Sequence, residues 1–296
     1  MTLRTALFLL IVLCIPFVGL AESSSAKPEP YEVKLEQGIE YFYQTDWDKA
    51  SSIFEELKTS DDSDPRAFFF HSMIPFWEYF FGGNSSEAAV RFMQRSEKAI
   101  EISSNRLKEN PHDTTMVLML SGLYGYRSLV AANEKNYRTA IQSGITGFRY
   151  TRQLLALDDE DPKALIGKGI FYYMAGTVPK ELRWATNMMG IRGDKEEGLK
   201  ILEKAATSNS YVSNDAKMIL SYLYKKEKKY SLALQHIEDL CQRYEENIIF
   251  QFNYAEILEK SNRQKEAKRA YQAVVELQNP HLDSLNAQSR VKIRNL

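Results

Sequence analysis

A small side chain recurs six times inside apolar helical stretches of this chain, and this recurrence constrains the fold more than any other feature. The six residues are Gly38, Ser72, Ser121, Gly169, Ser221 and Ala255. In four of the six stretches a tyrosine follows three residues later, one turn along the same helix face. Because a small residue at a helix crossing lets two backbones approach, its repetition predicts stacked helix pairs in an α-solenoid.

Further apolar residues follow the small residue at constant offsets. After Gly38, Ser221 and Ala255, an alanine comes twelve residues later and larger apolar residues come at sixteen and nineteen. These spacings place the later residues on one stripe of a second helix, which docks on the first helix. The repeat positions that we assign are Gly38, Tyr41, Ala50, Phe54, Ser121, Tyr124, Gly169, Tyr172, Ser221, Tyr224, Ala233, Ala255, Ala267 and Tyr271.

Helix-start signals agree with this layout. In both Asp64-Pro65 and Asp161-Pro162 the aspartate caps a predicted helix and the proline takes the first position of that helix. Together these residues resemble the tetratricopeptide repeat (TPR) family over residues 31–280. The resemblance implies an all-α, right-handed α-solenoid of about six helix pairs. The predicted units start near Tyr31, Pro65, Thr114, Pro162, Asn214 and Ile248.

Three units depart from the regular pattern. In the fourth unit the second helix fits only after 17 inserted residues, because Gly198 follows Gly169 by 29 positions instead of 12. In the third unit the second helix is predicted over Tyr137–Leu157, several turns longer than the repeat requires. In the second unit Pro75 takes the tyrosine position and predicts a kink.

The N-terminus predicts export. Residues 1–21 have the pattern of a signal peptide. A short basic start is followed by an apolar run, and small residues lie near the end of that run. Cleavage near Ala21 would leave a flexible linker over residues 22–30 and a periplasmic or secreted protein, and an uncleaved anchor is the alternative. Residues 281–296 are expected to form a capping helix and tail.

Composition narrows the range of partners and chemistry. With 38 basic and 39 acidic residues the formal net charge is −1, which gives no reason to expect nucleic-acid binding. Membrane association is expected only through a partner or an uncleaved signal. The four histidines do not occur at metal-ligand spacing, and no nucleophile motif or phosphate loop is present. We therefore expect no catalysis, no metal and no cofactor.

The family resemblance also implies where a partner binds. It predicts a concave groove on the first helix of each pair, with aromatic side chains and charges of both signs that suit an extended peptide or a helix. The groove residues that we assign are Leu35, Ile39, Phe42, Tyr43, Met218, Tyr222, Lys225, Phe252, Glu256 and Glu259. The basic run Lys225–Lys229 falls at a turn and is interpreted as a solvated turn.

The insertion between residues 177 and 194 admits two interpretations. Its Trp184, Met188 and Met189, together with arginines, form a composition typical of recognition loops, but the same side chains can also plug a gap between repeats.

From the sequence we expect a non-catalytic interaction scaffold of the cell envelope that binds a protein or peptide partner. The alternative is a stable subunit of an envelope or outer-membrane assembly complex. A second alternative is a hydrolase that uses segment 177–194 as a lid.

Overall fold

The computed structural model describes residues 30–156, 161–178, 193–209 and 212–296. The predicted signal peptide, nearly all of the predicted linker, and Trp184, Met188 and Met189 lie outside the described residues. The described residues contain thirteen helices and no strand. None of these helices is long and apolar enough to cross a bilayer.

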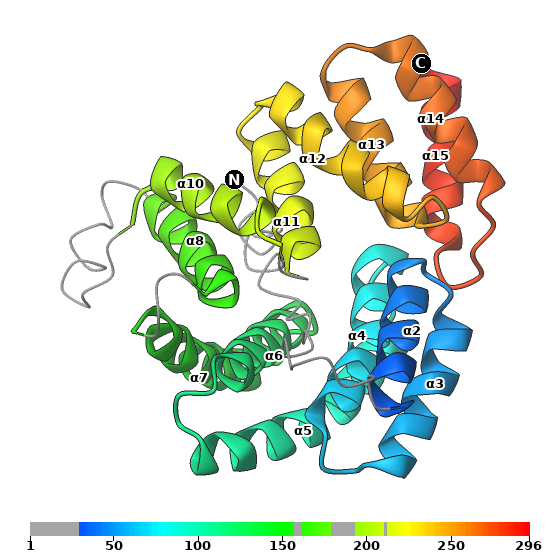
Figure 1. Ribbon diagram of the computed structural model, residues 1–296. Helices are drawn as coiled ribbons and strands as arrows, with labels where there is room; N and C mark the ends of the chain where they lie inside the picture. The colour runs from blue at the N-terminus through cyan, green and yellow to red at the C-terminus, as the bar shows by residue number, and fades with distance from the viewer. Residues whose placement is uncertain (1–29, 157–160, 179–192, 210–211) are drawn as a thin grey trace. The chain divides into compact units, whose positions relative to one another are not determined.

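Successive helices pack against one another as pairs (Figure 1). The helices are α2 (Pro30–Tyr43), α3 (Trp47–Ser60), α4 (Pro65–Gly82), α5 (Ser86–Glu109), α6 (Thr114–Asn133), α7 (Tyr137–Leu155), α8 (Pro162–Gly176), α10 (Lys195–Ala206), α11 (Ser213–Lys226), α12 (Tyr230–Arg243), α13 (Ile248–Lys260), α14 (Gln264–Glu276) and α15 (Asp283–Asn295). Each predicted unit start lies within one residue of the observed start of a first helix. The prediction of an all-α, TPR-like repeat of helix pairs is therefore confirmed.

The described chain divides into two compact units. The middle unit comprises residues 103–220, and the terminal unit comprises residues 30–102 together with residues 221–296. The terminal unit thus contains the first two helix pairs and the last repeats. Helices α5 and α11 cross the boundary between the units.

The turn inside a helix pair has the same geometry in three pairs of the terminal unit. Thr45, Lys228 and Asn262 each lie seven residues after the aligned small residue, and their φ angles are 61°, 60° and 63°. In each turn the next N–H donates to a carbonyl one turn back in the first helix, as Lys229 N does to Tyr224 O at 2.8 Å. This Schellman-type closure satisfies carbonyls that the helix end leaves without partners.

The third pair has a different register from the predicted one. Its turn residue with a positive φ is Lys135, and counting back seven residues places Ser128 at the crossing position. Ser128 Oγ donates to the carbonyl of Ala140 on α7 at 2.8 Å. The predicted residue, Ser121, lies about two turns earlier, where its hydroxyl bonds Thr151 Oγ1 at 2.7 Å. Both helices of this pair are longer than in the regular pairs, whereas the sequence predicted a long second helix alone.

Pro75 does not end α4. The helix continues through it from Pro65 to Gly82. Because proline has no N–H, the carbonyl of His71 loses its helical partner. Arg95 Nη1 of α5 donates to that carbonyl at 3.3 Å, which supplies the missing hydrogen bond.

Glycines at the helix crossings allow close backbone contact, as the sequence predicted. A Cβ atom on Gly38 would lie 2.7 Å from the ring of Phe54. A Cβ atom on Gly169 would lie 2.9 Å from the carbonyl oxygen of Gly198, and one on Gly198 would lie 2.6 Å from that of Gly169. No side chain larger than hydrogen fits these crossings without movement of the neighbouring helix.

In the terminal unit the first helices pack against helices from the far end of the chain. The ring of Tyr43 stacks on that of Tyr244 with centroids 5.3 Å apart. Asn247 Nδ2 donates to the carbonyl of Tyr43 at 2.5 Å, across 204 residues of sequence. The rings of Trp77 and Phe250 also meet, with centroids 6.4 Å apart. A strictly linear solenoid, in which each repeat contacts only its neighbours, does not make these contacts.

We predict that Gly38→Ala destabilises the protein by about 1–3 kcal/mol, because the new methyl group overlaps the Phe54 ring. This loss outweighs the gain of about 1 kcal/mol that alanine brings to a helix interior. Urea denaturation measures the change. The control is the same change in a Phe54→Leu background, where the smaller side chain leaves room for the methyl group and the loss should shrink. A Gly38→Ala protein as stable as the wild type would contradict the packing at this crossing.

A second prediction tests the contact between the two ends of the terminal unit. Asn247 is fully buried, and its Oδ1 also caps α13 by accepting from Phe250 N at 2.9 Å. Asn136 caps α7 through Thr139 N but is exposed. We expect Asn136→Ala to cost about 1 kcal/mol. Asn247→Ala should cost about 1–3 kcal/mol more in denaturant titrations, because it also removes the buried hydrogen bond to the Tyr43 carbonyl. Equal losses in the two variants would mean that this bond contributes nothing.

Candidate partner-binding site

The predicted groove residues of the first pair are not on an accessible surface. Leu35, Ile39, Phe42 and Tyr43 are each at most 2% exposed. The Phe42 ring lies 4.8 Å from that of Trp77, and the α12–α13 region covers Tyr43. The expectation of an open groove at these four residues is therefore corrected. The physical reason is the contact with the last repeats, which the sequence did not reveal.

The predicted residues of the last two pairs do meet, on one face formed by α11, α13 and α15. Lys225 Nζ forms an ion pair with Glu256 Oε2 at 2.9 Å and also donates to Asn253 Oδ1. Asn253 Nδ2 donates in turn to Ser221 Oγ at 3.2 Å. The ammonium of Lys225 lies 5.6 Å from the centre of the Tyr222 ring, in cation–π geometry. We call this surface the α11/α13/α15 face.

Glu259 extends the same network toward α15. Its carboxylate accepts from Tyr271 Oη at 2.6 Å and from Lys292 Nζ at 2.8 Å. Burial opposes ionisation of Glu259, but these two hydrogen bonds prevail and lower the pKa of its carboxyl group. The pKa of Tyr271 is raised, by burial and by the bond to Glu259. Phe252 packs edge-on against the Tyr271 ring at 5.7 Å, so aromatic and charged groups alternate here.

Met218 lies on α11 within the middle unit, and its side chain is half-buried. We therefore do not count it with the α11/α13/α15 face. Trp184, Met188 and Met189 lie outside the described residues, so their predicted role stays a prediction.

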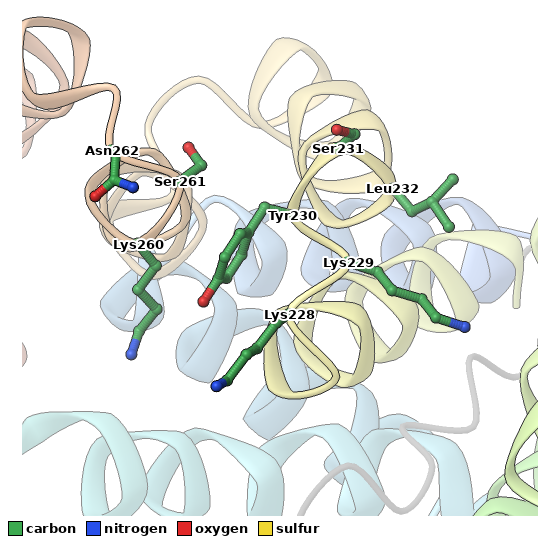
Figure 2. Close-up of a pocket in the computed structure, with 8 residues that line it drawn as sticks. All are labelled: Lys228, Lys229, Tyr230, Ser231, Leu232, Lys260, Ser261 and Asn262. Carbon is green, nitrogen blue, oxygen red and sulfur yellow. The ribbon is translucent and has the colours of Figure 1, made fainter.

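A basic pocket of about 440 Å³ lies between the turns that follow α11 and α13. Its described lining contains three lysines, Lys228, Lys229 and Lys260, and no acidic residue. Figure 2 shows the side chains of Lys228, Tyr230 and Lys260 extending in the same direction, whereas Lys229 points away. The C-terminal ends of α11 and α13 carry partial negative charge that favours lysines there.

The sequence interpretation did not identify Lys260, which lines this pocket together with Lys228 and Lys229. It recognised the basic run Lys225–Lys229 but treated it as a solvated turn. Lys260 lies 34 residues after Lys226 of that run, at the same place in the next pair. Comparing equivalent turn positions of neighbouring repeats would have found it.

One pair of side chains resembles a catalytic arrangement. Ser51 Oγ lies 3.0 Å from His71 Nε2, and Lys58 Nζ lies 2.9 Å from His71 Nδ1. Burial, Arg95 and Lys58 lower the pKa of His71 to about 3, against the opposing effect of Glu55. Because Lys58 must donate to Nδ1, the proton of the neutral ring sits on Nε2, which then donates to Ser51. A general base needs an open nitrogen and a pKa near the working pH, and His71 has neither.

Other reactive chemistry finds little support in the described residues. No group of three potential metal ligands occurs among them. Burial, with a contribution from Glu238, raises the pKa of the Cys241 thiol to about 12, so this cysteine stays protonated at neutral pH.

No protein-family model matches the sequence, and no curated protein matches it either. Among solved structures, the chain is similar to a thermophilic TPR protein of Thermus thermophilus, at 12% identity and a TM-score of 0.44. That match covers 77% of this chain and 98% of the other. The chain is also similar to the TPR domain of P58(IPK), at 14% identity and a TM-score of 0.28, over 90% of this chain and 99% of that domain. The fold assignment rests on the helix pairs themselves.

We predict that the neutral state of His71 makes stability pH-dependent. Its unfolded pKa is about 6.5, and its folded pKa is lower, so the unfolded chain binds the additional proton as the pH falls below about 6.5. This stability is present above that pH and is lost on acidification, at up to about 1.4 kcal/mol per pH unit.

His71→Gln removes this contribution. The difference in unfolding free energy between the wild type and His71→Gln should therefore shrink as the pH falls from 7 to 5. Urea denaturation at several pH values measures this difference. A constant difference over that range would show that His71 titrates alike in the folded and unfolded chains.

Proposed function

We propose that this protein is a non-catalytic interaction scaffold whose α11/α13/α15 face binds an extended segment of a protein partner. The observation that carries this proposal is the convergence of Tyr222, Phe252 and paired charges from α11, α13 and α15 onto one face. Aromatic side chains that are partly exposed beside satisfied polar groups are the usual anchors of peptide recognition.

The charges of the face indicate the kind of segment that fits. Lys225 is paired with Glu256, and Lys292 is paired with Glu259, so the helix faces are locally neutral. Excess positive charge remains at the basic pocket, where Lys228 and Lys260 extend together. A bound segment is therefore expected to place apolar or aromatic side chains against Tyr222 and Phe252, and a carboxylate near Lys228 and Lys260.

We also propose that the protein works in the cell envelope. The signal-peptide pattern of residues 1–21 supports this location. The alternative role for the protein is a stable subunit of an envelope or outer-membrane assembly complex. Such a subunit would be bound to its partners at a fixed ratio, whereas a scaffold would bind them transiently. Affinity purification of the mature chain separates the two roles: transient ligands support a scaffold, and a fixed-ratio membrane complex supports the subunit.

We predict that random 12-residue peptides selected on the full chain will include a class that binds the α11/α13/α15 face. These peptides should carry aromatic or apolar residues followed by Asp or Glu. Tyr222→Ala should weaken their binding by about tenfold or more, and so should Lys228→Glu combined with Lys260→Glu. Fluorescence anisotropy with labelled peptides measures the affinities.

The control for this experiment is Lys265→Glu combined with Arg269→Glu. It makes the same change in charge on α14 and should leave the affinities within about twofold, since exposed rim charges contribute little. Peptides that bind all variants equally, or that carry no acidic residues, would count against the proposed site.

A further inference from the structure

Helix α7 presents an apolar row to solvent. Tyr137, Ile141 and Ile145 recur every fourth residue and are 59%, 62% and 59% exposed. Residues four apart are neighbours on a helix surface, so the three side chains form one continuous row. The other large hydrophobic side chains that are exposed in the described chain are scattered singly over α2, α5, α12 and α15. Single exposed residues are ordinary, but a row is not.

The opposite side of α7 is already packed. Thr151 bonds Ser121 of α6, and a Cβ atom on Gly147 would lie 3.2 Å from the backbone of Gly125. On the row's own side, Phe148 lies one turn after Ile145, and its ring stacks on that of Phe171 of α8 at 6.2 Å, so the row is exposed only before this contact. The exposed row is therefore a second apolar stripe on a helix whose first stripe is buried in the middle unit. A helix that is apolar on two sides is typical of one that is covered on both.

The surroundings of the row are positively charged. Arg138, Arg149 and Arg152 are exposed, and α7 contains no Asp or Glu from Tyr137 to Leu155. None of the three arginines forms an ion pair with another residue that the structure describes. Beyond Ile145 the row opens into a pocket of about 430 Å³ whose lining includes Arg149 and Arg152.

We propose that the exposed face of α7 docks an amphipathic helix of a protein partner, with acidic residues flanking its apolar ridge. The row runs from Tyr137 to Ile145, a rise of about 12 Å along the helix, which is the length of two to three turns of a partner helix. The ridge of that helix would pack along Tyr137, Ile141 and Ile145. Its carboxylates would pair with Arg149 and Arg152, in the bidentate geometry that arginine favours.

Charge favours this occupant over the others. The chain's own insertion, residues 177–194, has three basic residues and two acidic ones, a net charge of +1 that offers the arginines no excess of carboxylates. The acidic run 158–160 has carboxylates but no apolar side chain to cover the isoleucines. An anionic membrane would meet a molecule of net charge −1 through a row only one residue wide, whereas interfacial helices bury a broad apolar face.

A helix-biased library of 18-residue peptides, selected on the full chain, tests this proposal. The expected peptides carry apolar residues at i, i+4 and i+7 with an excess of Asp and Glu. Their affinity should fall about tenfold or more with Ile141→Ser combined with Ile145→Ser, and also with Arg149→Glu combined with Arg152→Glu. The matched controls are Val33→Ser combined with Val90→Ser, which changes two exposed apolar residues elsewhere, and Lys265→Glu combined with Arg269→Glu, which makes the same change in charge elsewhere. Thermal melts followed by circular dichroism verify that every variant is folded.

Three outcomes would overturn the proposal. The first is that no selected peptide depends on Ile141 and Ile145, or that the dependent peptides are not acidic. The second is that the wild type, but not the isoleucine variant, sediments with vesicles of phosphatidylglycerol and phosphatidylcholine, which would make the occupant a membrane. The third is self-association of the wild type that the isoleucine variant abolishes. The α7 variants leave the α11/α13/α15 face intact, so failure here is separable from failure of the proposed function.

Discussion

The fold depends on close contact between helix backbones at the crossings inside each pair. At Gly38 the partner helix places the Phe54 ring where a Cβ atom would stand, and Gly169 and Gly198 bring two backbones together directly. In the third pair the crossing residue is Ser128, and its hydroxyl donates to the carbonyl of Ala140 on the partner helix. Once a pair is fixed in this way, its remaining apolar stripe can dock on the next pair.

The contact between the first and last repeats determines which of the predicted groove residues stay exposed. Burial of Tyr43 against Tyr244, with the bond from Asn247, removes the first pair from the available binding surface. The equivalent side of α11 and α13 stays partly exposed and carries the Lys225–Glu256 pair. Residues at equivalent repeat positions thus have opposite roles, one in the core and one on the surface. Position in the repeat alone does not assign function.

The sequence predicted the features that are local, and it could not predict those that join distant segments. Aspartate caps, first-turn prolines and the spacing around Gly38 located the first helices to within one residue, because these signals act within a few turns. The register of the third pair was wrong, because Ser121 and Ser128 are both small residues on one helix and only the turn at Lys135 distinguishes them. The hydrogen bond between Asn247 and Tyr43 depends on how the repeats stack. The presence of Lys228 and Lys260 in one pocket depends on the same stacking.

The nearly neutral net charge of the chain does not exclude local sites that bind charged peptides. At physiological ionic strength charges are screened over about 8 Å, so a peptide that covers one or two helix turns responds to the charges beside it and not to the total of −1. Lys228 and Lys260 in their pocket, and Arg149 and Arg152 on α7, are local positive sites on this scale. The local charge distribution therefore supports the short acidic protein segments that we propose for these two sites.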